Sequence, residues 1–116
     1  MQVLIVDDEA PARARLRQLL AAHADVEIAG EAETGVQAME FAAQLKPDVL
    51  LLDIQLPDID GFEVAERLAQ ADDSPAVVLI STRDVSSYRR RLARSSVCGF
   101  VSKSELSGSA ICALVP

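Results

Sequence analysis

Acidic side chains stand directly after two runs of aliphatic residues. Asp7 and Asp8 follow the run at residues 3–6, and Asp53 follows the run at residues 49–52. Aliphatic runs without a polar break are typical of strands buried on both faces of a parallel sheet. Because the carboxyl ends of parallel strands lie at one edge, the three carboxylates should lie close together there. Taken alone, each aspartate could instead cap a turn or the helix that follows it.

Two more runs of this kind bring a hydroxyl and an ammonium group to the same edge. Ser81 and Thr82 follow residues 76–80, and Lys103 follows residues 99–101 closely. Clustered carboxylates repel one another, which raises their pKa values unless a cation shares the site. A hard divalent ion such as Mg²⁺ takes oxygen ligands and keeps several waters, so it suits two or three carboxylates with one open side. A metal ion, an ammonium and a hydroxyl around a nucleophilic carboxylate favour phosphoryl transfer.

Five predicted strands and five predicted helices would hold these groups in place. The strands should be centred near Val3, Ile28, Leu50, Val78 and Val101. Strict alternation at this spacing predicts a parallel sheet with right-handed crossovers and helices on both faces. The second strand is expected at residues 26–29, and the third helix from about residue 62. The apolar sides of the five helices are predicted to consist of Ala12, Leu16, Leu19 and Leu20; of Val36, Met39, Ala42 and Ala43; of Phe62, Ala65, Leu68 and Ala69; of Val85, Tyr88 and Leu92; and of Leu106, Ala110, Ala113 and Leu114.

The composition fits one domain and argues against several classes of protein. The 116 residues are 50% hydrophobic but only 3% aromatic, so we expect a single core of aliphatic side chains. A net charge of −7 argues against a general nucleic-acid binder, which needs a basic face. No apolar run approaches the roughly 20 residues that span a bilayer, and no cleavable leader is visible, so we expect a cytoplasmic protein without membrane contact. Cys98 and Cys112 lack the spacing of a metal site and are expected to be small buried hydrophobic residues.

Four motifs that occur in order along the chain resemble those of response-regulator receiver domains of two-component signalling. They are Val6-Asp7-Asp8-Glu9, Leu52-Asp53-Ile54-Gln55-Leu56-Pro57-Asp58-Ile59-Asp60-Gly61, Ser81-Thr82 and Gly99-Phe100-Val101-Ser102-Lys103. The resemblance runs along essentially the whole chain and implies one receiver domain over residues 1–116. It also implies a flavodoxin-like α/β fold, a (βα)5 three-layer sandwich whose parallel sheet has the strand order 2-1-3-4-5.

The resemblance implies a role for each residue of the site. Asp53 would accept a phosphoryl group from the histidine of a sensor histidine kinase. Asp8 and Asp53 would ligate Mg²⁺ directly, Asp7 would act largely through water, and the backbone carbonyl of Gln55 would complete the protein ligands. Lys103 would pair with the phosphoryl group. Such a domain catalyses only its own phosphorylation and dephosphorylation and is not otherwise an enzyme.

Other residues are implied to carry the switch and to set its lifetime. Ser81 would turn its hydroxyl to a phosphoryl oxygen, and Phe100, at the position of the family's switch aromatic, would turn inward behind it. A static aromatic in the core would satisfy the sequence at Phe100 equally well. Gln55 and Arg83 occupy the positions that tune water attack on the phospho-aspartate in the family, and Thr82 would narrow access to it. We expect dephosphorylation to be slower than average.

The signal would leave through the face formed by the fourth helix, the fifth strand and the fifth helix. That face would meet a downstream protein, an output domain or a second copy of the chain. Arg89, Arg90, Arg91 and Arg94 lie on the predicted fourth helix, either as a solvated face or as partners for acidic groups, and Arg13 is expected on a wetter side of the first helix. The chain could be a stand-alone receiver or part of a longer, DNA-binding regulator. No direct nucleic-acid binding is expected of this domain.

Two other classes of protein stay open at this point. A phosphorylation-independent interaction module on a receiver scaffold would not need the full set of site residues, all of which are present. A phosphatase of the dehalogenase type would use similar chemistry. It needs a second acid two residues after its nucleophile, where this chain has Gln55, and usually a cap domain for which there is no room.

Overall fold

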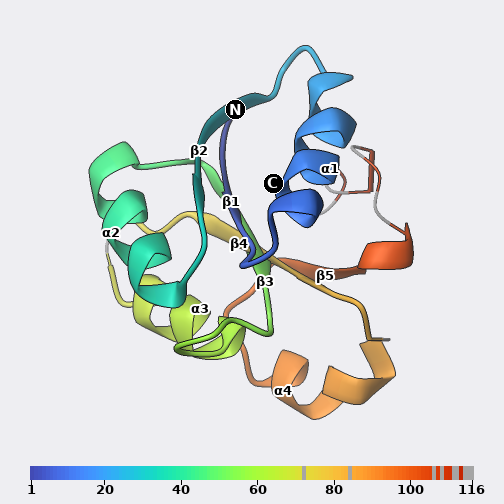
Figure 1. Cartoon of the computed structure of the whole chain (residues 1–116). Coiled ribbons are helices and arrows are strands. Elements are labelled where there is room, and N and C mark those ends of the chain that lie inside the picture. The colour runs from blue at the N-terminus through green and yellow to red at the C-terminus, as the bar shows by residue number, and fades with distance from the viewer. Residues whose placement is uncertain (72, 84, 106, 108, 111–112, 114–116) are drawn as a thin grey trace.

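The computed structural model describes residues 1–71, 73–83, 85–105, 107, 109–110 and 113 of the chain (Figure 1). Its centre is a five-stranded parallel sheet with the strand order β2-β1-β3-β4-β5. The strands are β1 (Gln2–Val6), β2 (Glu27–Ala32), β3 (Val49–Asp53), β4 (Ala76–Ser81) and β5 (Gly99–Ser102). The predicted fold, a flavodoxin-like α/β sandwich with strand order 2-1-3-4-5, is confirmed.

Helices pack on both faces of this sheet (Figure 1). They are α1 (Ala10–Ala21), α2 (Gly35–Leu45), α3 (Gly61–Ala69) and α4 (Arg89–Ala93), with the 3-10 turns η1 (Val85–Tyr88) and η2 (Lys103–Glu105). The predicted fourth helix is thus split into a 3-10 turn and a short α-helix. Much of the predicted fifth helix, at residues 106–114, lies outside the described residues. Within the described ranges, every helix is too short or too polar to cross a membrane.

Side chains alternate between the two faces of each strand, which divides the core into two clusters. The face covered by Leu16 and Leu20 of α1 consists of Val3, Ile5, Val49, Leu51, Val78 and Ile80. The face covered by α2, α3 and η1 consists of Leu4, Val6, Leu50, Leu52, Val77 and Leu79. By the same alternation, Asp53 leaves β3 on the α1 face, whereas Ser81 leaves β4 on the opposite face. All five residues of β3 are buried, so this strand is a rigid support for Asp53.

The second strand is longer than the sequence predicted. β2 continues to Ala32, which pairs with Val6, instead of ending at residue 29. β2 is an edge strand and therefore needs no continuous apolar run. Gly30 and Glu31 continue the strand, although residues of these types are common in loops. Glu31 is therefore held in the sheet, next to α1.

The buried side of α2 differs from the predicted one. Val36 is 49% exposed, whereas Ala38 and Ala42 are buried against the sheet. Apolar residues occupy most sides of this helix, so their periodicity did not identify the buried side. The small side chains of Ala38 and Ala42 allow the helix to approach the sheet closely.

Two smaller predictions were wrong. In α3, Val64 is buried and Ala69 is exposed, because the helix presents Phe62, Val64 and Ala65 to the core. Cys98 is an exposed free thiol and not a buried hydrophobic residue. Cys112 lies outside the described residues.

Candidate functional site

Three carboxylates meet where β1 and β3 end. Asp53 is the last residue of β3, and Asp7 and Asp8 directly follow β1. One carboxylate oxygen from each residue lies within 4.8 Å of the others. Asp7 and Asp53 are buried, whereas Asp8 is exposed. The structure therefore brings together the three acids that the sequence analysis expects at this edge of the sheet.

Lys103 places its ammonium group between the two buried carboxylates. Its Nζ lies 2.8 Å from Oδ2 of Asp7 and 3.4 Å from Oδ2 of Asp53. The other carboxylate oxygens accept backbone hydrogen bonds, Asp7 Oδ1 from Glu9 at 3.0 Å and Asp53 Oδ1 from Gln55 at 3.2 Å. The contact with Asp7 Oδ2 is an ion pair without hydrogen-bond geometry, so this buried oxygen accepts no hydrogen bond from the described residues. Such an oxygen has capacity for a further cation.

Among the described residues, the negative charges of the site outnumber the positive charge beside them. Burial raises the pKa of Asp53, although the hydrogen bond from Gln55 and the charge of Lys103 act in the opposite direction. Burial lowers the pKa of Lys103, but the carboxylates of Asp7 and Asp53 outweigh this effect and raise it overall. One ammonium thus faces three carboxylates, one of them Asp8. A cluster of carboxylate oxygens with excess negative charge is the donor set that Mg²⁺ prefers.

Ser81 lies at the same edge, but its hydroxyl group contacts Arg83 and Tyr88. The residue ends β4 and is 1% exposed. Its Oγ accepts a hydrogen bond from the backbone N–H of Arg83 at 3.1 Å and lies 3.4 Å from the hydroxyl oxygen of Tyr88. The neighbouring Thr82 is exposed. Of the two candidate hydroxyls, that of Ser81 is the buried one.

Three other predicted residues surround this arrangement. Gln55 is exposed and contacts the site through its backbone N–H, which donates to Asp53. The side chain of Arg83 is also exposed. Phe100, in β5, is partly buried and packs its ring on Tyr88, with the ring centroids 5.9 Å apart. Tyr88 contacts both Phe100 and Ser81, and the sequence analysis gave this residue no role beyond packing.

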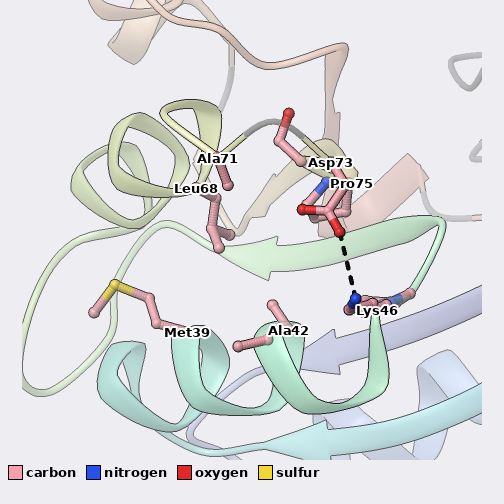
Figure 2. Close-up of a pocket in the computed structure, with 10 residues that line it drawn as sticks. Met39, Ala42, Lys46, Leu68, Ala71, Asp73 and Pro75 are labelled. Atoms are coloured by element: carbon pink, nitrogen blue, oxygen red, sulfur yellow. Dashed lines mark ion pairs between the residues drawn. The ribbon is translucent and has the colours of Figure 1, made fainter.

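A pocket of about 260 Å³ lies between α2 and α3, at the opposite end of the sheet (Figure 2). Its wall is largely apolar and includes Met39, Ala42 and Leu68. It is also lined by an exposed charged pair, in which Nζ of Lys46 lies 3.9 Å from Oδ2 of Asp73. Because this charged pair is solvated and the pocket lies far from the strand ends that carry the acids, the carboxylate cluster is the stronger candidate for the functional site.

Comparison with known proteins identifies the family. The family model described as the response regulator receiver domain matches residues 3–114. The chain belongs to this family. Receiver domains of this kind are components of two-component signalling systems, and a small acidic site at the carboxyl edge of a parallel sheet is consistent with that assignment.

The relatives of this receiver domain are regulatory proteins of several kinds. It is 32% identical over 114 residues to the DNA-binding transcriptional activator EvgA of Escherichia coli K12, covering 98% of this chain and 55% of EvgA. It is 44% identical over 82 residues to a protein-glutamate methylesterase/protein-glutamine glutaminase of Myxococcus xanthus, covering 71% of this chain and 24% of that protein. The signal receiver domain of the response regulator NarL from Mycobacterium tuberculosis superposes with a TM-score of 0.86 at 27% identity, covering 97% of this chain and 94% of that one. The receiver domain thus spans only about a quarter to about half of its full-length relatives.

Arg13 supports the acidic site of the receiver domain from α1, contrary to the prediction that it faces water. Its side chain is only 13% exposed. Its guanidinium donates to the backbone carbonyl of Asp7 at 2.7 Å and to Glu31 at 3.1 Å. The sequence analysis missed this role because it ended the second strand before Glu31. Recognising that β2 continues through Glu31 would have revealed the charge pair.

Asp58 ties the loop after β3 to the start of α2. Its Oδ1 accepts a hydrogen bond from the backbone of Gly35 at 2.8 Å, and its Oδ2 accepts one from Val36 at 2.9 Å. These are unpaired N–H groups of the first helical turn, so Asp58 caps a helix that lies far from it in sequence. The loop that follows Asp53 is thereby fixed at a second point.

Replacing Asp58 by alanine is expected to lower the free energy of unfolding by about 1 kcal/mol, the usual contribution of a helix cap. The hydrogen bond from Gly35 holds the pKa of Asp58 below its ordinary value of 3.8. The stabilisation is therefore fully present above that value and is lost as the pH falls through the lower pKa of the folded state. Urea unfolding at neutral and at acid pH measures this difference. Glu40→Ala, at an exposed position of α2, serves as the control, and an equal loss in both variants would contradict the capping role.

Proposed function

We propose that Asp53 accepts a phosphoryl group from the phosphohistidine of a sensor histidine kinase, and that this modification switches the domain between two states. The observation that carries the proposal is the ammonium of Lys103, which lies 2.8 Å from Asp7 and 3.4 Å from Asp53 at the end of a fully buried strand. The arrangement offers a nucleophilic carboxylate beside a fixed positive charge. Phosphoryl transfer requires little more than such positioning and charge neutralisation.

The transfer would begin with attack by a carboxylate oxygen of Asp53 on the phosphorus atom. The new O–P bond forms while the P–N bond to the kinase imidazole breaks. The imidazole nitrogen keeps the electron pair of the broken bond and takes up a proton from solvent. Only the ionised carboxylate is a nucleophile. Burial raises the pKa of Asp53, whereas the hydrogen bond from Gln55 and the positive charge of Lys103 favour its ionised form. Lys103 would neutralise the charge on the phosphoryl group.

The acidic cluster is proposed to hold Mg²⁺, which receiver domains generally use. Asp8 and Asp53 would be direct ligands, Asp7 would act largely through water, and the backbone carbonyl of Gln55 would complete the set. The donor chemistry and the buried Asp7 oxygen without a hydrogen bond support this assignment. When bound, the ion would neutralise negative charge on the phosphoryl oxygens. The chain itself contributes the fixed positions of the carboxylates and of Lys103.

The switch is proposed to run from Ser81 and Phe100 to the surface around α4 and β5. Gln55 and Arg83, whose side chains are exposed beside the site, would tune the access of water to the phospho-aspartate. The output would be a protein contact in the cytoplasm, with an output domain, a separate partner or a second copy. A DNA-binding output is supported by the similarity to EvgA. The domain would turn over no substrate other than its own phosphoryl group.

Incubation with acetyl phosphate, followed by mass measurement of the intact protein, tests the proposed function. We expect the parent chain to gain one phosphoryl group in the presence of Mg²⁺ and much less without it. Asp53→Asn should gain none, because an amide oxygen is a poor nucleophile. Asp73→Asn, at an exposed position between α3 and β4, should behave as the parent chain does. A phosphoryl group on the Asp53→Asn protein, or none on the parent chain with any donor including a histidine kinase, would contradict the proposal.

A further inference from the structure

Tyr88 occupies a buried position between the proposed switch residues. It ends η1, is 7% exposed and is the only tyrosine of the chain. Its ring packs on Phe62 and on Phe100, with both centroid distances at 5.9 Å. Among the described residues, its hydroxyl has one hydrogen-bond partner, the Oγ of Ser81 at 3.4 Å. A buried hydroxyl that depends on one partner is strongly affected when that partner moves.

The geometry of the strands separates this hydroxyl pair from the phosphorylation site. Ser81 lies on the same side of β4 as Val77 and Leu79, in the cluster that also contains Tyr88. Asp53 lies on the same side of β3 as Val49 and Leu51, in the cluster covered by α1. The two side chains therefore start on opposite faces of the sheet. To reach a phosphoryl group on Asp53, the hydroxyl of Ser81 has to turn around the end of β4 and leave Tyr88.

We propose that Tyr88 is a positioning residue that holds the Ser81 hydroxyl away from the phosphorylation site in the resting state. The inference rests on the proposed function, because it assumes that Ser81 turns to a phosphoryl group on Asp53. When Ser81 turns, the Tyr88 hydroxyl loses its buried partner, and the side chain has to move to find another. Phe100 has no polar atom and cannot sense this change directly. Tyr88 therefore converts the turn of Ser81 into a movement of η1.

The movement of Tyr88 has a direct route into α4. Arg91 lies one helical turn further on, and its guanidinium packs over Phe62, 4.2 Å from the ring centroid. The same guanidinium donates a hydrogen bond to Asp60 Oδ2 at 2.6 Å. Asp60 in turn caps α3, accepting from the backbone of Glu63 at 3.0 Å. A shift of Tyr88 against Phe62 thus disturbs the contacts that hold α4 to the start of α3.

Substitution of Tyr88 by phenylalanine tests the inference, because it removes the hydroxyl and keeps the ring. We expect the rate of phosphorylation by acetyl phosphate in Mg²⁺ to rise about two- to tenfold, the factor that corresponds to one net hydrogen bond. The same substitution in a Ser81→Ala background should leave the rate unchanged, because no hydroxyl remains to be held. An effect that persists in the Ser81→Ala background would mean that Tyr88 acts through packing alone and would overturn the inference. Equal rates for Tyr88→Phe and the parent chain would overturn it as well.

Fluorescence provides a second readout that a purely structural role would not change. The chain has no tryptophan and one tyrosine, so its intrinsic emission reports on Tyr88 alone. Beryllofluoride with Mg²⁺, which mimics the phosphoryl group, should change this emission in the parent chain and not in Ser81→Ala. Blocked phosphorylation by acetyl phosphate shows that beryllofluoride is bound to the sample. Unchanged emission of the parent chain in such a sample would overturn the role of Tyr88. If the parent chain takes up no phosphoryl group at all, the proposed function fails first, so the two failures are distinguishable.

Discussion

Replacing Lys103 by methionine is expected to lower the free energy of unfolding by about 3 kcal/mol in buffer without divalent ions. The ammonium lies within 3.4 Å of both buried carboxylates, and its side chain is 19% exposed. Methionine fills a similar volume but leaves the carboxylates of Asp7 and Asp53 facing each other without a cation. Breaking a buried ion pair from one side is costly because the remaining charge stays desolvated. Urea unfolding followed by circular dichroism measures the loss.

The pH dependence of this loss follows from the pKa of Asp53. Burial already raises that pKa above its ordinary value, and removal of Lys103 raises it further. When the pKa of a carboxyl group is higher in the folded state than in the unfolded state, ionisation of that group destabilises the fold. The free energy of unfolding therefore falls as the pH rises from the unfolded-state pKa through the folded-state pKa. The deficit of the Lys103→Met variant should therefore be smallest at acid pH and largest at neutral pH. Asp53→Asn, combined with Lys103→Met, should recover part of the stability, and so should added Mg²⁺.

Lys46→Met is the matched control for the loss of one positive charge. The side chain of Lys46 is 73% exposed, and its Nζ lies 3.9 Å from Asp73 (Figure 2). A solvated pair of this kind contributes little, so we expect a change within about 0.5 kcal/mol. If both variants lost the same amount, the burial of the site charges would not be the cause, and the electrostatic description of the site would be wrong.

Substitution of Gly61 by alanine is expected to lower the free energy of unfolding by about 2 kcal/mol and to slow phosphorylation. A Cβ atom at this position would lie 2.8 Å from the backbone oxygen of Asp53 and 2.9 Å from the Cα of Ile54. Gly61 also donates a backbone hydrogen bond to Ile54 at 2.8 Å, which keeps the two segments in contact. Neither atom can yield as a flexible side chain would, so the strand end itself has to shift. Urea unfolding and the acetyl phosphate assay measure the two effects.

Gly30→Ala controls for the general effect of adding a methyl group. A Cβ atom there would meet the tip of the Leu45 side chain at 3.0 Å. Leu45 is 44% exposed, so its side chain can move aside. We expect little change in stability and a normal rate of phosphorylation. A Gly61→Ala protein as stable and as reactive as Gly30→Ala would show that the contact with Asp53 has no consequence.

The sequence predicted the sheet and the meeting of the acids because both depend on simple physical regularities. The aliphatic runs before Asp7, Asp53 and Ser81 identify buried parallel strands, and parallel strands end at one edge. The orientation of the Ser81 hydroxyl toward Tyr88 could not be predicted in this way. It depends on the packing of a ring between Phe62 and Phe100, and a sequence of apolar residues does not specify which rings touch.

The wrong predictions for β2 and α2 arose because the apolar pattern of the sequence does not specify these elements fully. β2 pairs on one side only, so its residues are not selected for apolarity, and the sequence analysis ended the strand before Glu31. That error concealed the partner of Arg13 and made a nearly buried arginine look solvated. In α2, apolar residues lie on several sides of the helix, so the sequence alone does not specify that Ala38 and Ala42 are the buried residues.

Among the described elements, we expect α4 to be far less stable locally than β3. None of the five residues of α4 is buried, whereas all five residues of β3 are. An element with few buried contacts opens on its own, at a free energy far below that of global unfolding, so its backbone amides exchange with solvent deuterium early. We expect the amides of β3 to stay protected until the whole domain unfolds. If the proposed switch operates, we therefore expect α4 to rearrange more readily than β3, while the strand that carries Asp53 keeps its place.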